Sequence, residues 1–166
     1  MKKQTRKNIF ETNSSSVHTI TISRHAYNRT SVPNTLMFKL GEFGWKVAKL
    51  DTPEEKAEYL YTAINGLDNM NRLVEKIRCA CASIECDAVF EESVTESPFD
   101  FYIDHSECLS YFIEKVFESD DSILRYLFGD GCVYTYNDNM NTDDLYFANE
   151  IKSVNENDYI VIRKGN

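Results

Sequence analysis

Apolar and polar residues alternate along the chain from Val17 to Ser23, in the sequence VHTITIS. Alternation with a period of two is the signature of a β-strand. In such a strand successive side chains point to opposite faces, so His18 shares a face with two isoleucines. We predict a strand inside a sheet here, with Ser16, His18, Ile20 and Ile22 on one face and Val17, Thr19 and Thr21 on the other.

Further short runs rich in β-branched and aromatic residues predict more strands. The clearest lie at residues 35–40, 132–136 and 158–163. Residues 87–92 and 100–104 are shorter candidates. Strands are therefore expected at both ends of the chain.

Helices are expected between those strands. Thr52, Pro53 and Glu55 form a strong helix start, with a hydroxyl at the N-cap and a glutamate three residues later, and this helix should run to about Asn65. Apolar residues at helical spacing predict three more helices, which begin near Asp68, Asp104 and Ser119, and the last should end at Gly129. The first two are expected to form an αα-hairpin that packs on the sheet.

Strands at both ends with helices between them favour an α+β fold over a repeating βαβ fold. The 166 residues fit one domain that is large enough to bury a core. We therefore predict a single α+β domain spanning residues 1–166, with a short basic arm at residues 1–7. Its small, mostly antiparallel sheet should pack against about four helices.

The composition indicates an ordered intracellular protein. Hydrophobic residues make up 42% and aromatic residues 13% of the chain, with few glycines and prolines. No apolar run approaches the length of a membrane span, and no apolar segment of a signal peptide follows the basic start. Five cysteines, an odd number, agree with a reducing compartment. We expect a soluble cytoplasmic protein with no membrane partner.

Three cysteines, Cys79, Cys81 and Cys86, raise the question of a zinc site. Their spacing on an expected helix does not match the paired cysteines that close a tetrahedral site. Cysteine commonly behaves as a small buried apolar residue, so packing in the core is the favoured interpretation. We expect no zinc and reduced thiols.

An Asn/Asp-rich loop follows residue 136, and some of its residues are spaced like the ligands of a calcium-binding loop. Asn141, Asp143 and Glu150 fall at ligand positions counted from Asn139. Asn139 replaces the opening aspartate, and Asp144 stands where the sharp turn needs glycine. A solvated turn is therefore favoured, and we expect no metal and no cofactor.

Charge is distributed unevenly along the chain. Residues 1–50 carry nine Lys or Arg and two acids, a net charge of +7, whereas residues 51–166 carry nine Lys or Arg and 25 acids, a net charge of −16. The basic part would attract an anionic, phosphate-bearing ligand. The acidic part could instead meet a basic protein partner.

A polar loop that leads into the first strand concentrates the chemistry of the chain. Within eight residues it holds hydroxyls, an amide, a carboxylate and an imidazole, which makes it the candidate site. For metal-free RNA cleavage His18 is the best base, because its ordinary pKa lies near neutrality, and Glu11 could orient it or transfer the second proton. The hydroxyls of Ser14, Ser15 and Ser16 and the amide of Asn13 could bind phosphate, while Arg6, Lys7 and Arg24 could supply positive charge.

Two other interpretations of the same residues stay open. A serine could be a nucleophile that His18 activates, although no G-x-S-x-G sequence is present, so this ranks lower. Alternatively, His18 is a half-buried strand residue and the serines form a solvated turn.

The sequence FETNSSSVH, from Phe10 to His18, resembles an N-terminal signature of small proteins of phages and mobile elements. This group includes anti-CRISPR inhibitors of Cas9, some of which are associated with loss or truncation of the guide RNA. The resemblance implies a counter-defence protein whose partners are Cas9, its guide RNA or both, and a possible metal-independent ribonuclease. The alternative is a non-enzymatic acidic inhibitor that binds Cas9 or another defence protein as a nucleic-acid mimic.

Overall fold

The first predicted strand lies inside the main sheet. The computed structural model describes residues 16–44, 46–92, 102–103 and 109–164. Four antiparallel strands are ordered β4–β7–β1–β8. These are β1 (Ser16–Ser23), β4 (Ala48–Leu50), β7 (Val133–Asn137) and β8 (Tyr159–Lys164). The prediction of an interior strand from Val17 to Ser23 is therefore confirmed, because β7 and β8 flank β1.

Four shorter strands form two parallel pairs outside this sheet. β2 (Thr35–Phe38) pairs with β5 (Asp87–Phe90), and β3 (Glu42–Phe43) pairs with β6 (Tyr102–Ile103). The sequence located most of these strands but could not show which strands they pair with.

The four expected helices are present in the described residues. They are α1 (Pro53–Ile64), α2 (Met70–Ala82), α3 (Ser110–Val116) and α4 (Asp120–Phe128). The capping box of Thr52 and Glu55 forms as predicted, and Ser119 caps α4 by accepting from the Ser122 amide. The predicted α3 start near Asp104 lies outside the described residues.

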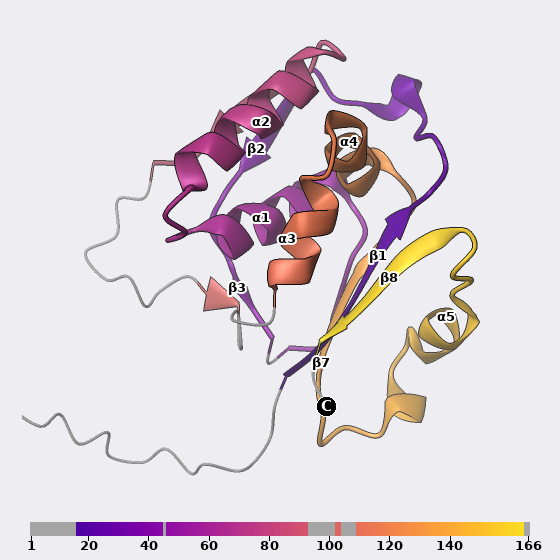
Figure 1. Cartoon of the computed structure of the whole chain (residues 1–166). Helices are drawn as coiled ribbons and strands as arrows, with labels where there is room; N and C mark the ends of the chain where they lie inside the picture. Colours follow the sequence, from indigo (N-terminus) through magenta and orange to yellow (C-terminus); the bar gives the residue numbers. More distant parts are fainter. Residues whose placement is uncertain (1–15, 45, 93–101, 104–108, 165–166) are drawn as a thin grey trace, which may run out of the picture.

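The main sheet separates two layers of helix (Figure 1). Helices α1 to α4 lie on one side, and the short helix α5 (Ala148–Ser153) lies on the other. α4 packs on β1, while α2 packs mainly on α4 and β5 instead of forming a tight hairpin with α1. Four substantial helices and an antiparallel four-stranded sheet confirm the α+β fold class.

Each side of the sheet has its own hydrophobic core. Ile20 and Ile22 of β1 point into the larger core, which α1, α2, α3 and α4 complete. On the opposite side Tyr134 and Tyr136 of β7 pack with Phe147 in a smaller core, against which Val17 also lies. The predicted division of β1 into two faces is confirmed, and both faces are covered.

The connection between β7 and β8 is more ordered than a simple solvated turn. It contains a 3-10 turn, η3 (Thr142–Asp144), and α5. Asn141 caps η3 by accepting from the Asp143 amide, and Asp143 forms an ion pair with Lys152. Asn141 and Asp143, two of the residues at calcium-loop spacing, therefore serve local structure.

Two of the three cysteines considered for zinc pack in the larger core. Cys81 and Cys86 are buried there, whereas Cys79 is exposed on α2. In the described ranges, no three His, Cys, Asp or Glu side chains are grouped closely enough to hold a metal ion.

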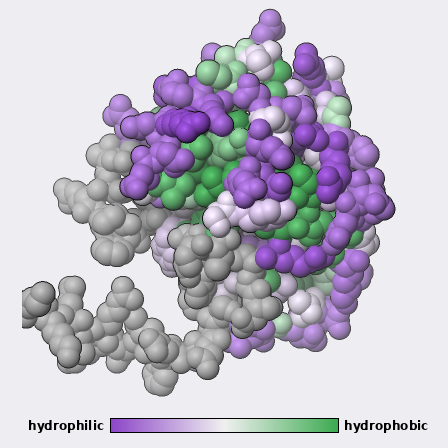
Figure 2. Space-filling view, in the orientation of Figure 1, coloured by the Kyte–Doolittle hydropathy of each residue, from purple (hydrophilic) through white to green (hydrophobic). Residues whose placement is uncertain are grey.

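The surface over the helical layer is mostly polar. Figure 2, in the orientation of Figure 1, shows hydrophilic residues over much of the visible face and hydrophobic side chains gathered between them near its middle. Among the described residues, the large apolar side chains that stay exposed are scattered over several elements: Met37, Leu67, Val89, Tyr102, Tyr111, Met140 and Tyr146.

Candidate functional site

His18 lies in the interior of the protein, between β1 and α1. Its side chain is 0% exposed. Its Nδ1 is hydrogen-bonded to the Tyr59 hydroxyl at 2.8 Å, and its Nε2 to Ser16 Oγ at 3.2 Å. A neutral imidazole has one donor and one acceptor nitrogen, so these two hydroxyls can satisfy both. The three side chains form a hydrogen-bonded row in the order Ser16, His18, Tyr59.

Aromatic side chains enclose the Tyr59 end of this row. The Tyr59 ring packs edge-on against Phe43 at 5.1 Å and against Phe112 at 5.7 Å between ring centroids. Burial raises the pKa of Tyr59 above its ordinary value, so the hydroxyl stays neutral and can hold the imidazole in one orientation.

The structure brings together only part of the predicted site. Ser16 and His18 lie side by side, but Arg24 follows the opposite end of β1, about 20 Å of extended chain from His18. Arg24 is exposed and donates to the carbonyl of Glu156. The other predicted site residues lie outside the described residues: Arg6, Lys7, Glu11, Asn13, Ser14 and Ser15.

The row has the order of a nucleophile, a base and a group that orients the base. All three members are nevertheless buried, with Ser16 1% exposed and Tyr59 0% exposed. A substrate must come within hydrogen-bonding reach of the base for proton transfer. In the described arrangement the row ties β1 to α1, and its chemistry would need the start of β1 to open.

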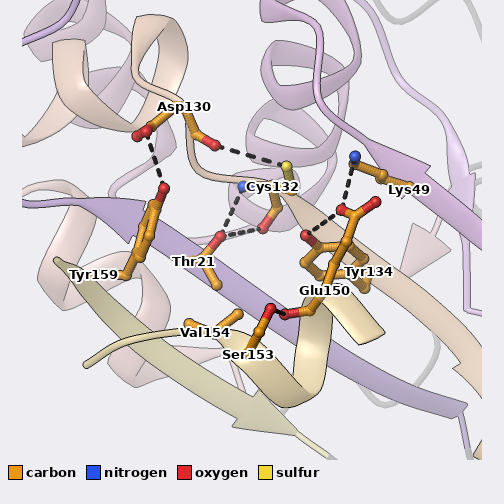
Figure 3. A pocket seen from close by; sticks show the side chains of 9 residues that line it. All are labelled: Thr21, Lys49, Asp130, Cys132, Tyr134, Glu150, Ser153, Val154 and Tyr159. Carbon is orange, nitrogen blue, oxygen red and sulfur yellow. Dashed lines mark hydrogen bonds and ion pairs between the residues drawn. The ribbon is translucent and has the colours of Figure 1, made fainter. Parts of the chain in front are cut away.

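A second candidate site lies on the other face of the sheet, beside α5. It is a pocket of about 310 Å³. Figure 3 shows Asp130 and Tyr159 on one side of Thr21 and Cys132, and Lys49, Tyr134 and Glu150 on the other. Ser153 and Val154 close the α5 side. Strands β1, β4, β7 and β8 and the start of the loop after α5 all contribute to the lining.

Each of the two carboxylates in the pocket accepts a tyrosine hydroxyl. Tyr159 donates to Asp130 Oδ2 at 2.9 Å, and Tyr134 donates to Glu150 Oε2 at 3.1 Å. Lys49 also donates to Glu150 Oε2 at 2.8 Å, which raises the pKa of Lys49 and lowers the pKa of Glu150. Burial alone would raise the pKa of Asp130, but hydrogen bonds from Ser23 and Tyr159 hold it below its ordinary value. Both carboxylates are therefore ionised at neutral pH.

Cys132 forms part of the floor of the pocket. Burial raises the pKa of its thiol, while its hydrogen bond with Tyr134 and the charges of Lys49 and Lys56 oppose the shift only in part. The thiol is therefore protonated at neutral pH, and this cysteine is not an activated nucleophile.

Sequence reasoning missed this pocket. Its residues come from five separate stretches of the chain, and α5, which carries Glu150, lies in a segment without a strong helical pattern. The only signals were chemical: Asp130 precedes a predicted strand, and Glu150 falls at one of the calcium-loop positions.

Within the described parts of the chain, no helix has the length and apolar character needed to span a bilayer. In comparisons with known proteins, no family model, no curated protein and no solved structure matches this chain.

Proposed function

We propose that this protein is a counter-defence protein of a phage or mobile element that acts in the cytoplasm of the bacterial host. Its target would be Cas9 with its guide RNA, and it would inhibit by binding the complex instead of cutting the guide. The choice of target rests on the resemblance of residues 10–18 to anti-CRISPR proteins. The choice of binding over cleavage rests on one observation, the complete burial of His18.

Burial of His18 weighs against a role as general base. The ring is covered, and both of its nitrogens are engaged by Ser16 and Tyr59. A general base must come within hydrogen-bonding reach of the proton that it removes, and the described arrangement leaves no exposed part of the ring for an RNA to contact. Inhibition through the protein surface requires no such opening.

Exposed carboxylates supply a surface that is complementary to a nucleic-acid-binding enzyme. Glu118, Asp120 and Asp121 are exposed at the start of α4. On α1, burial raises the pKa of Glu58; the charge of Lys39 opposes this shift, and the charges of Glu55 and Glu91 add to it. Enzymes that hold nucleic acid present positive grooves, and such grooves attract acidic surfaces.

Guide-RNA cleavage is the second candidate, and the hydrogen-bonded row favours it. Ser16, His18 and Tyr59 have the order of an activated hydroxyl, a base and an orienting group. If the start of β1 separates from α1 in the Cas9 complex, the row would meet the RNA.

One set of reactions tests both candidates. Purified protein is incubated with Cas9 and its guide, and target-DNA cleavage and guide length are measured in the same samples, with and without chelator. Inhibition with an intact guide and a stable complex in gel filtration supports binding. Inhibition that tracks guide shortening supports cleavage. Unimpaired DNA cleavage together with the absence of a complex would overturn the proposed function.

A variant pair tests the acidic surface. Replacing Glu118, Asp120 and Asp121 with their amides removes three charges near α4, and we expect the complex to weaken by about tenfold or more at low salt. The matched control replaces Asp68, Asp144 and Glu156, three exposed acids outside α4. Equal loss in both variants would assign the effect to net charge alone and would exclude α4 as the contact.

A further inference from the structure

The pocket beside α5 is lined mainly by groups that accept hydrogen bonds. Of its two carboxylates, Glu150 keeps one oxygen, Oε1, that none of the described hydrogen bonds uses, whereas Asp130 accepts from both Tyr159 and Ser23. The hydroxyls of Tyr134 and Tyr159 donate their protons to those carboxylates, and the Tyr159 oxygen can still accept a hydrogen bond from a ligand. Ser153 likewise donates to the Glu150 carbonyl and keeps acceptor capacity. Acceptors therefore outnumber donors along the lining.

The charge of the lining also favours a cation. Two carboxylates, Asp130 and Glu150, face one ammonium group, that of Lys49. Two more charged residues lie outside the lining. Asp51 pairs with Lys49, and the buried Lys56 donates to the Gly129 and Gly131 carbonyls. The negative charge of Asp51 and the positive charge of Lys56 offset each other. An anion entering the pocket would meet a net negative charge.

The buried floor provides surface for an alkyl or planar group. The Thr21 hydroxyl is already hydrogen-bonded, because it donates to the Cys132 carbonyl and accepts from the Cys132 amide. Cys132 and the Tyr134 ring are largely buried beside it. Tyrosine rings attract cations through their faces. The volume of about 310 Å³ lies at the small end of ligand pockets, which span about 300–1,000 Å³.

From these observations we infer that the pocket binds a small organic cation carrying a primary ammonium or guanidinium group. Its charged end hydrogen-bonds to Glu150 Oε1 or to the Asp130 carboxylate, and its carbon atoms lie over Thr21, Cys132 and the tyrosine rings. A diamine fits the arrangement especially well, because the two carboxylates lie on opposite sides of the floor (Figure 3). The inference does not depend on the proposed function.

Calorimetry and amide chemical-shift mapping on the full chain test the inference in about 0.15 M salt, which screens the net charge of the protein. The probes are putrescine, agmatine and N-acetyl-arginine amide, with inorganic phosphate as the anion of opposite sign. We expect the cations to bind with a dissociation constant on the order of 1 mM and to shift residues of the pocket. Binding of putrescine but not of the capped arginine identifies a free amine as the ligand, and preference for the capped arginine identifies the side chain of a peptide. Both outcomes support the inference.

Charge-matched variants locate the binding. Asp130→Asn and Glu150→Gln should each weaken agmatine binding by about tenfold, whereas Glu114→Gln, an exposed acid on α3, should leave it unchanged. Thermal melts of each variant show that it is folded. The inference would be overturned if no cation binds at a concentration 20-fold above the expected dissociation constant, if phosphate binds more tightly than the cations, or if Glu114→Gln weakens binding as much as the pocket variants do.

Discussion

The Tyr59 hydroxyl lies 2.8 Å from Nδ1 of His18, and both side chains are fully buried. This hydrogen bond joins the interior strand β1 to the helix α1, and its two residues are 41 positions apart in the chain. A buried hydrogen bond between two such elements supports the packing of the larger core.

Removal of that hydroxyl should destabilise the fold. We expect Tyr59→Phe to lower the free energy of unfolding by about 1–3 kcal/mol, because His18 loses a buried partner while the ring packing is kept. Urea titration followed by circular dichroism measures the change. Tyr111→Phe, at an exposed tyrosine on α3, is the control and should be neutral. Equal stability of the two variants would show that the hydroxyl contributes nothing.

His18→Ala separates a structural role from a catalytic one. We expect a loss of about 2–4 kcal/mol, because the substitution opens a cavity and leaves the Tyr59 hydroxyl without its imidazole partner. Inhibition of Cas9, corrected for the folded fraction, should be unchanged. A stable variant that loses inhibition and leaves the guide intact would instead place His18 in the mechanism.

Lys56 should make stability depend on pH. Its ammonium is buried and donates to the Gly129 and Gly131 carbonyls, and burial lowers its pKa from 10.5 to about 8, although Asp51 and Asp130 oppose this. Between those two values the unfolded chain binds a proton that the folded protein lacks, so stability rises with pH. Relative to Lys56→Met, the free energy of unfolding of the natural protein should increase by about 2 kcal/mol from pH 7 to pH 9.5.

The comparison stops at pH 9.5 because tyrosines act in the opposite direction above it. Burial raises the pKa of Tyr59 and Tyr126, so their ionisation favours the unfolded chain at high pH. Parallel pH profiles for the natural protein and Lys56→Met would refute the assignment to Lys56.

Two glycines should respond very differently to alanine. A methyl group at Gly131 would lie 2.1 Å from the Thr21 carbonyl oxygen, which belongs to the backbone of β1 and cannot yield. Gly66 has a φ of +81° and open space around it, so Gly66→Ala should cost only about 1–2 kcal/mol of backbone strain. We expect Gly131→Ala to lower the melting temperature much more than Gly66→Ala. A smaller effect at Gly131 would mean that β1 and β7 can separate locally.

The N-cap of α1 offers a local test. Thr52 accepts from the Glu55 amide, and Glu55 in turn accepts from the Thr52 amide. Thr52→Ala should destabilise the protein by about 1 kcal/mol, and Thr52→Ser should retain most of the stability. Denaturant midpoints for the two variants check this, and an equal loss in both would show that the hydroxyl is not the relevant group.

The sequence by itself determined the local elements. Alternation located β1 and its two faces, and the capping residues Thr52 and Ser119 located the starts of α1 and α4. These signals are readable because they depend on residues only a few positions apart, within one strand or one helical turn. The weaker segment that forms α5 carried no such signal and was missed.

Only the tertiary structure decided what surrounds His18 and which residues form the pocket. Alternation placed His18 beside Ile20 and Ile22, but it could not show that α1 would cover that face and bring Tyr59 to the ring. Likewise Lys49, Asp130 and Glu150 are far apart in the chain and line one pocket only because β4, the segment before β7 and α5 come together in the fold. Such contacts depend on strand pairing and on the packing of distant elements, which local side-chain patterns do not specify.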